Sequence, residues 1–167
     1  LIDYNEIAKG VNIFINNTIR SASTTTAQAI YLLDDTDGAT ISSTYNNFIN
    51  NTIRGYRGVY LNSNAEYNNF VGNNITATLT GINFDGSSNN IFRDCVSLSG
   101  GSYDFYTQNA VTNVTLINCS FTLSKGVVNS GGAITNKWYY RAYANYSNST
   151  PAAGVNISIN SSLGPVG

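Results

Sequence analysis

The sequence predicts an all-β solenoid of about five stacked coils, because one phrase returns along the chain at a nearly constant spacing. Residues 46–53 read almost like residues 11–19, and related phrases follow at 69–75, 90–96 and 114–121. The spacing is about 22 residues, with a longer insertion in the first unit, and such a period is typical of folds built by stacking one unit. No segment has the i, i+3, i+4, i+7 apolar pattern of an amphipathic helix.

Each unit contains a second apolar segment, and both segments alternate apolar and polar residues with the period of a β-strand. Short strands at regular spacing also occur in sandwiches and barrels. Those folds do not require near-identical phrases at a fixed period, so a solenoid is favoured. The second segments are 29–32, 58–61, 81–84, 103–106 and 126–128.

Two phrases carry a resemblance to known repeats: F-x-x-N-x-I, as in residues 48–53, and G-I/V-x-L/F, as in residues 58–61. They resemble the repeats of large microbial surface proteins, archaeal and bacterial, and of the carbohydrate-binding and sugar-hydrolase group. The resemblance covers about residues 5–134 and implies a right-handed parallel β-helix. It implies little about activity, because the same coil serves lyases, adhesins and structural fibres.

Stacked coils lie about 4.8 Å apart, so equivalent apolar residues are expected to form ladders inside the solenoid. The first expected ladder is Phe14, Phe48, Phe70, Ile91 and Leu116. The second is Ile19, Ile53, Ile75, Val96 and Phe121. Asparagine amides can bond successive turns together, which we expect of Asn17, Asn51 and Asn73. We expect Gly58, Gly81 and Gly126 to supply the other corner of each coil.

The composition excludes several classes of function. Only 10% of residues are charged, the net charge is −1 and histidine is absent. A basic nucleic-acid footprint is therefore excluded, as are histidine catalysis and histidine metal ligands. No cofactor is expected, and no apolar run is long enough for a membrane span. Neither a signal peptide nor methionine is visible, so we expect a processed mature protein or a piece of a larger one.

The last 33 or so residues differ in character, which predicts a boundary between residues 1–134 and 135–167. Residues 138–146 alternate as one long strand, and a turn leads to a second strand at 155–159. This looks like the opening of an Ig-like or carboxypeptidase-regulatory-like module, of which a whole copy needs about 80 to 100 residues. Three alternatives stay open for this hairpin. The rest of its module was cut away, or the hairpin packs on the solenoid, or it completes a sheet in a neighbouring subunit. Expected assembly residues are Trp138, Tyr140 and Tyr143.

N-x-S/T sequons recur along the chain, which indicates either glycosylation of a surface protein or chance in a chain rich in Asn, Ser and Thr. The sites in the tail, Asn145, Asn148 and Asn160, are the favoured acceptors because they lie outside the repeat strands. The sequons begin at Asn16, Asn50, Asn74, Asn113, Asn118, Asn145, Asn148, Asn156 and Asn160.

The densest acidic cluster, Asp34, Asp35 and Asp37, ends in a glycine and is a weak candidate for a Ca²⁺ site. It lacks the first ligand and the closing Glu of an EF-hand loop, so a solvated turn is preferred. Arg20 and Arg54 follow the same ladder residue in consecutive units. The resemblance implies that lyases of this fold use Arg or Lys as a base beside acidic Ca²⁺ ligands. Such a row is missing here, because the remaining acids fall at different points of their coils; these are Asp85, Asp94 and Asp104.

The two cysteines, Cys95 and Cys119, fall in adjacent coils, offset by one position in the alignment of the repeats. Stacking could bring them within bridging range in an oxidising compartment. Two buried thiols acting as small apolar residues are slightly preferred, because stacked parallel strands offer an awkward geometry for the bond.

Two classes of function remain. The first is a non-enzymatic structural or interaction protein of a microbial surface, such as a fibre subunit, surface-layer piece or adhesin. It would be extracellular, and it would associate with itself or with neighbouring domains through its terminal coils and the 138–159 hairpin. Surface glycans are a further possible partner. The alternative is a carbohydrate-active β-helix, either a polysaccharide lyase or epimerase or a glycan-binding module.

Overall fold

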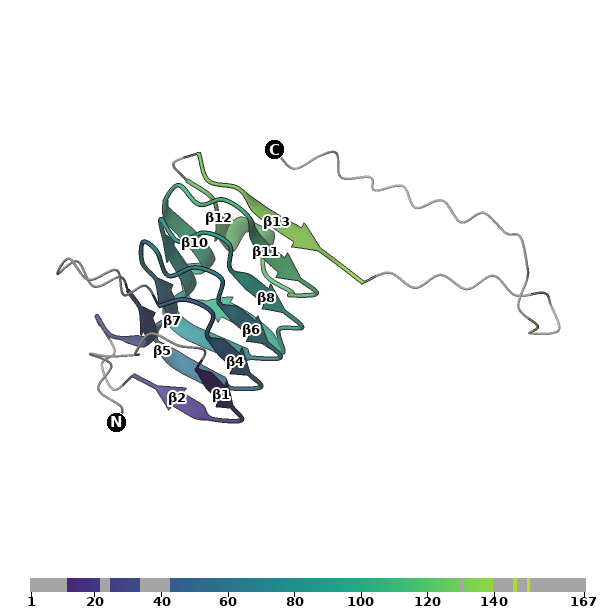
Figure 1. Cartoon of the computed structure of the whole chain (residues 1–167), viewed down its shortest axis with the longest axis horizontal. Helices are drawn as coiled ribbons and strands as arrows, with labels where there is room; N and C mark the ends of the chain where they lie inside the picture. The colour runs from purple at the N-terminus through teal and green to yellow at the C-terminus, as the bar shows by residue number, and fades with distance from the viewer. Residues whose placement is uncertain are drawn as a thin grey trace.

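The described residues form an all-β parallel solenoid of about four turns, which confirms the fold class predicted from the repeats. The computed structural model describes residues 12–21, 25–33, 43–129, 131–139, 146 and 150. Every strand pair in these ranges is parallel. Figure 1 shows the strands of successive turns side by side along the solenoid axis. No helix within these ranges has the length and hydropathy needed to cross a bilayer.

The first sheet, called sheet A, consists of short strands that begin each turn. It continues without a break through the whole described solenoid, because each strand pairs with the equivalent strands of the adjacent turns. Its order is β1 (Ile13–Ile15), β4 (Asn47–Ile49), β6 (Asn69–Val71), β8 (Ile91–Arg93), β11 (Val114–Ile117) and β13 (Ile134–Lys137).

The second sheet, called sheet B, is built on long strands that bend around the rest of each turn. Its central path is β12 (Gly126–Val127), β10 (Tyr103–Asn109), β7 (Asn74–Asp85), β5 (Thr52–Leu61) and β2 (Thr18–Arg20). Two further strands pair with this path, β3 (Gln28–Leu32) with β5 and β9 (Ser97–Gly100) with β7. A short 3-10 helix, η1 (Leu123–Lys125), precedes β12.

The first ladder is confirmed except in the fourth turn, where Phe92 and not Ile91 stacks on Phe70. The prediction of Ile91 was wrong because Asn90 aligns with Asn68 and not with Asn69. The backbone N–H of Asn68 donates to Oδ1 of Asn90. Ile91 therefore points outward and is exposed. The ladder found is Phe14, Phe48, Phe70, Phe92 and Leu116.

The second ladder holds for Ile19, Ile53 and Ile75, and then continues at Leu98. The expectation for Val96 was wrong because the fourth turn has one extra residue after its corner. Val96 is that residue and is 72% exposed. Phe121 does not extend the ladder either, and its ring meets that of Phe105 edge-on at 4.9 Å.

The sharp corners after sheet A are formed mainly by asparagine, and the glycines expected at the other corner of each coil do not form it. Gly58, Gly81 and Gly126 lie within strands and do not have positive φ. A Cβ on Gly58 would lie 2.6 Å from the carbonyl oxygen of Gly81, so these two glycines permit close approach of adjacent turns. The left-handed residues after the sheet A strands are Asn16, Asn50, Gly72, Asp94 and Asn118. Asn is one of the few residues that tolerates this conformation well.

Buried asparagines bond the turns together, as the sequence predicts for Asn51 and Asn73. Oδ1 of Asn73 accepts from the backbone N–H and the side-chain Nδ2 of Asn51, and its Nδ2 donates to the Phe48 carbonyl. Asn17 joins through its backbone N–H, which donates to Oδ1 of Asn51. A second such ladder, not foreseen, runs through Asn12, Asn46, Asn68 and Asn90.

Candidate functional site

The outer face of sheet B carries a column of aromatic residues. Tyr31 lies beside Tyr60, Tyr60 beside Asn83, and Asn83 beside Tyr106 in consecutive turns. In each strand the residues on both sides of the column position are buried in the core, as Val59 and Leu61 are. Side chains alternate across a strand, so these four side chains point outward. We call Tyr31, Tyr60, Asn83 and Tyr106 the tyrosine column.

Asn83 is the unusual member of the tyrosine column. Its side chain is 3% exposed although it points outward, and its Nδ2 has no hydrogen-bond partner among the described residues. The adjacent residues in the column are Tyr60 and Tyr106. A buried polar group without a partner is rare in folded proteins and calls for a specific explanation, such as strain, a catalytic role or a bound water or ion.

A hydrogen bond to Asp85 fixes the position of Tyr60. The Tyr60 hydroxyl donates to Oδ2 of Asp85 at 2.7 Å, and Nδ2 of Asn109 donates to Oδ1 of the same carboxylate. Burial raises the pKa of Tyr60 well above its usual value, and the hydrogen bond and negative charge of Asp85 raise it further. The hydroxyl therefore remains a donor, and both carboxylate oxygens of Asp85 already accept hydrogen bonds.

Further rings and one cation surround the column. The Arg57 guanidinium lies 5.6 Å from the ring centre of Tyr60 and 5.7 Å from that of Tyr56, within the range of cation–π interaction. The Tyr31 and Tyr60 rings meet edge-on at 5.1 Å. Tyr106 is flanked by Tyr103, with ring centres 5.0 Å apart. The outer face of sheet B therefore combines aromatic rings, the amide of Asn83 and the guanidinium of Arg57, which are groups that can bind a ligand.

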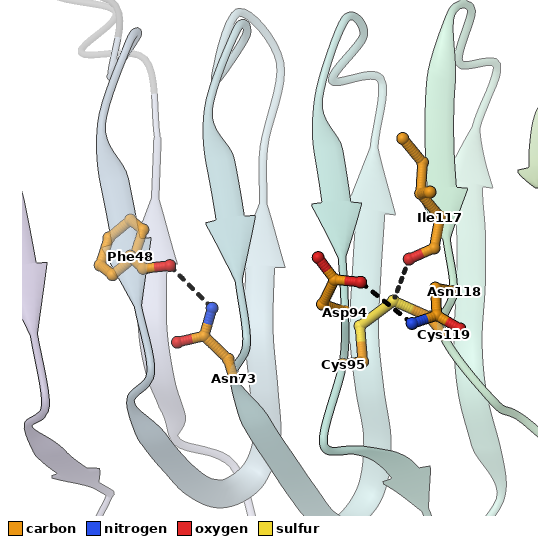
Figure 2. The surroundings of a disulfide bond; sticks show 7 residues. All are labelled: Phe48, Asn73, Asp94, Cys95, Ile117, Asn118 and Cys119. Atoms are coloured by element: carbon orange, nitrogen blue, oxygen red, sulfur yellow. Dashed lines mark hydrogen bonds between the residues drawn. A yellow bond between two sulfur atoms is a disulfide. The ribbon is translucent and has the colours of Figure 1, made fainter. Parts of the chain in front are cut away.

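A disulfide joins Cys95 and Cys119, which the sequence slightly favoured as two thiols. Their Cα atoms lie 4.7 Å apart, within bridging range. The offset of one position was also wrong, since the register of β8 with β11 places the two cysteines at the same point of consecutive turns. Figure 2 shows the bond just after the corner, where Nδ2 of Asn118 donates to Oδ1 of Asp94.

The described sequons fall at corners and at one strand. Asn16, Asn50 and Asn113 are exposed and have left-handed backbone. Asn118 has the same backbone but is half-buried, and Asn74 is half-buried in β7. Nδ2 of Asn113 donates to Oδ1 of Asn89. The sequons at Asn145, Asn148, Asn156 and Asn160 lie outside the described residues, and occupancy of all nine stays a prediction.

The charged candidates do not form a common site. Arg20 and Arg54 are neighbours in the register of β2 with β5, and both are exposed. Asp85 lies on the outer face of sheet B, where it bonds Tyr60, and Asp94 lies at a corner. Asp104 is buried within β10. No group of three His, Cys, Asp or Glu residues able to hold a metal occurs in the ranges that the structure describes.

The weak Ca²⁺ candidates Asp34, Asp35 and Asp37 lie outside the described residues, and so do Tyr140 and Tyr143 of the expected assembly segment. Trp138 follows β13 and is 54% exposed.

Sequence reasoning missed the tyrosine column, although it noted the phrases that contain it. The signal was the third residue of the G-V-Y-L and G-I-N-F phrases, Tyr60 and Asn83, because it faces away from the core between two buried apolar residues.

Comparison with protein-family models, with curated proteins and with solved structures finds no match to this chain.

Proposed function

We propose that this chain is a non-enzymatic structural or interaction protein of a microbial cell surface, a filament subunit, surface-layer piece or adhesin that associates through its ends. The supporting observation is that no described residue stacks on Phe14 from the side opposite Phe48, at the N-terminal end of the described core. Phe48, Phe70 and Phe92 are fully buried between neighbours, whereas Phe14 stacks on Phe48 at 4.8 Å and is only partly buried. We propose that a further turn from another chain or domain covers it; residues 1–11, which precede β1, lie outside the described residues.

The backbone of β1 supports the same proposal. On the side of β4, the Asn12 carbonyl accepts from Asn47 and the Asn16 N–H donates to Ile49. Backbone direction alternates along a strand, so the N–H of Ile15 points to the opposite edge. No strand of the described residues pairs with that edge. Such an edge recruits other chains unless it is blocked.

Two features favour an extracellular location. The Cys95–Cys119 disulfide is a bond that persists mainly in oxidising compartments. Exposed sequons, such as those at Asn16 and Asn50, would accept glycans in a secreted protein.

Sedimentation velocity over a range of concentrations tests the assembly. We expect the chain to associate, and Ile15→Pro to weaken this because proline lacks the edge donor and is tolerated in edge strands. Ile15→Thr keeps the N–H and is the matched control. A version ending at Thr135, checked for folding by circular dichroism, tests the C-terminal end. A chain that stays monomeric at high concentration, with variants that behave identically, would remove the proposal.

The non-enzymatic part has its own test. The chain is incubated with acidic polysaccharides and calcium, and ultraviolet absorbance is followed for unsaturated product. Product formation would favour the alternative, a polysaccharide lyase.

A further inference from the structure

We propose, on the basis of the function proposed above, that residues 154–163 form a joining turn that covers Phe14 of a neighbouring copy of this chain and links the copies head to tail. Within the described residues, sheet A ends at β1 and at β13, and each of these strands has one unpaired edge (Figure 1). The joining turn pairs with β13 of its own chain on one side and with β1 of the next copy on the other.

The sequence of the joining turn repeats the phrase that forms the first described turn. Residues 154–163 lie outside the described residues. Residues 154–160 read G-V-N-I-S-I-N and residues 10–16 read G-V-N-I-F-I-N, so the two phrases differ only where Ser158 replaces Phe14. Both phrases continue with two polar residues and one apolar residue. A shared phrase in a solenoid predicts a shared structure, here a sheet A strand followed by a corner.

The position of this phrase fits the period of the solenoid. The core position of sheet A recurs after 22 residues from Phe48 to Phe70. In the last described strand of sheet A, β13, this position is occupied by Asn136. Ser158 follows Asn136 after another 22 residues. The joining turn therefore lies where the next turn of the solenoid is expected.

The outward side chains of the joining turn match those of β1. Like phrases stack in register in this solenoid, as β4 does on β6. The same register places Ile157 beside Ile13 and Ile159 beside Ile15 of the neighbouring copy. Ile13 and Ile15 are 60% and 50% exposed. Because β-branched side chains are stabilised by packing against neighbours on the same face of a sheet, the joining turn gives these two residues apolar neighbours.

The core of the joint is more polar than the core of the solenoid. Ser158 lies between Asn136 of its own chain and Phe14 of the next copy, whereas Phe70 lies between two phenylalanine rings. Asn136 is exposed in the single chain, and polar terminal repeats keep solenoids soluble. The joint is therefore weaker than the contacts between turns, so that a filament separates into folded copies.

The pairing also determines the shape of the assembly. Parallel pairing of one end with the other repeats the same contact from copy to copy, which gives an open filament and not a closed dimer. The six described strands of sheet A and the joining strand predict an axial repeat of about 34 Å. Electron micrographs of the assembled chain measure this repeat, and closed two-fold pairs would overturn the proposal.

A competing peptide tests the joint in the full chain. The probe is a blocked peptide of residues 153–164, and a scrambled peptide of the same composition is the control. We expect the probe to occupy β1 and to convert assembled chain into monomer in sedimentation velocity. Assembly that persists equally with both peptides would overturn the joining turn and leave association through the ends in place. A chain that is monomeric without peptide would overturn both.

Variants of Ser158 test the core of the joint. Ser158→Phe places a ring against Phe14 and should lower the concentration of half-assembly about tenfold or more, whereas Ser158→Asp should raise it similarly. Ser149→Phe adds the same ring outside the joining turn and should have little effect. All proteins are made in a host without N-glycosylation, because Ser158 belongs to the sequon of Asn156. Equal assembly of the wild type and both Ser158 variants would overturn the proposal.

Discussion

Phe48 and Phe70 stack face to face, with ring centres 4.6 Å apart and planes 7° from parallel. This separation is close to the distance between paired strands, about 4.8 Å. Phe70 stacks on Phe92 in the same way, at 4.4 Å. The rings thus repeat with the backbone, and a slip of one residue would turn each ring out of the core.

The first prediction concerns this ring column. Phe48→Ala removes a fully buried ring between two stacked partners and should lower the free energy of unfolding by about 3 to 5 kcal/mol. Arg54→Ala, at an exposed position of the same turn, should change it by less than about 0.5 kcal/mol. Urea denaturation followed by circular dichroism measures both. If Phe48→Ala unfolds at the wild-type urea concentration, the role given to the column is wrong.

The second prediction concerns the asparagine ladder. Asn73→Leu leaves the Asn51 N–H and the Phe48 carbonyl without the Asn73 side chain that now bonds them. Each unsatisfied buried group costs about 1 to 3 kcal/mol, so a loss of about 2 to 4 kcal/mol is expected. Asn69→Ala on the outer face of sheet A is the control and should cost little. Thermal unfolding of the two variants should therefore separate clearly, and equal melting temperatures would contradict the prediction.

The third prediction concerns the disulfide. The bond closes a loop of 24 residues, for which the chain-entropy model gives a stabilisation of about 3.4 kcal/mol. The double variant Cys95→Ala/Cys119→Ala should lose stability of this order. Adding a reductant should destabilise the wild type and leave the double variant unchanged. Insensitivity of the wild type to a reductant that demonstrably cleaves the bond would argue against a stabilising role.

The fourth prediction concerns pH. The pKa of Tyr60 is raised in the folded protein above the unfolded value of 10.0, chiefly by burial and then by the hydrogen bond to Asp85. At high pH the unfolded chain therefore loses this proton first, and stability falls as pH rises above about 10. Below that pH the contribution of Tyr60 is fully present.

Tyr60→Phe separates this residue from the other tyrosines, because phenylalanine does not titrate. The stability advantage of the wild type over Tyr60→Phe should shrink between pH 9 and 11, as melting temperatures would report. An advantage that is constant or grows over this range would contradict the raised pKa.

The repeats predicted the fold because each turn must present the same residues to the next, and Phe48 over Phe70 follows from near-identical phrases. The predicted alignment of residues between turns was wrong where the repeated phrases diverge. In the fourth turn, which of two neighbouring residues enters the core depends on the bond between Asn68 and Asn90 and on the extra residue Val96. Neither the Asn68–Asn90 bond nor the extra residue can be recognised from the sequence of one turn alone. The offset of one position expected between Cys95 and Cys119 was wrong for the same reason.

The candidate site was harder to predict than the fold. Alternation along a strand places Tyr60 and Asn83 on the outer face, which the sequence alone could have indicated. The burial of Asn83 could not have been foreseen, because it depends on how side chains from other strands cover it. Such packing on an outer face leaves no periodic pattern.

The disulfide also has a mechanical consequence. Pulling on the two ends of a parallel solenoid detaches one turn after another, and each freed turn adds its extended length. The 24-residue separation of Cys95 and Cys119 corresponds to about 80 Å of fully extended chain. Because the covalent bond holds the two cysteines together, the chain between them cannot extend even after the turn has detached. An oxidised molecule under tension would therefore remain shorter than a reduced one by about that amount.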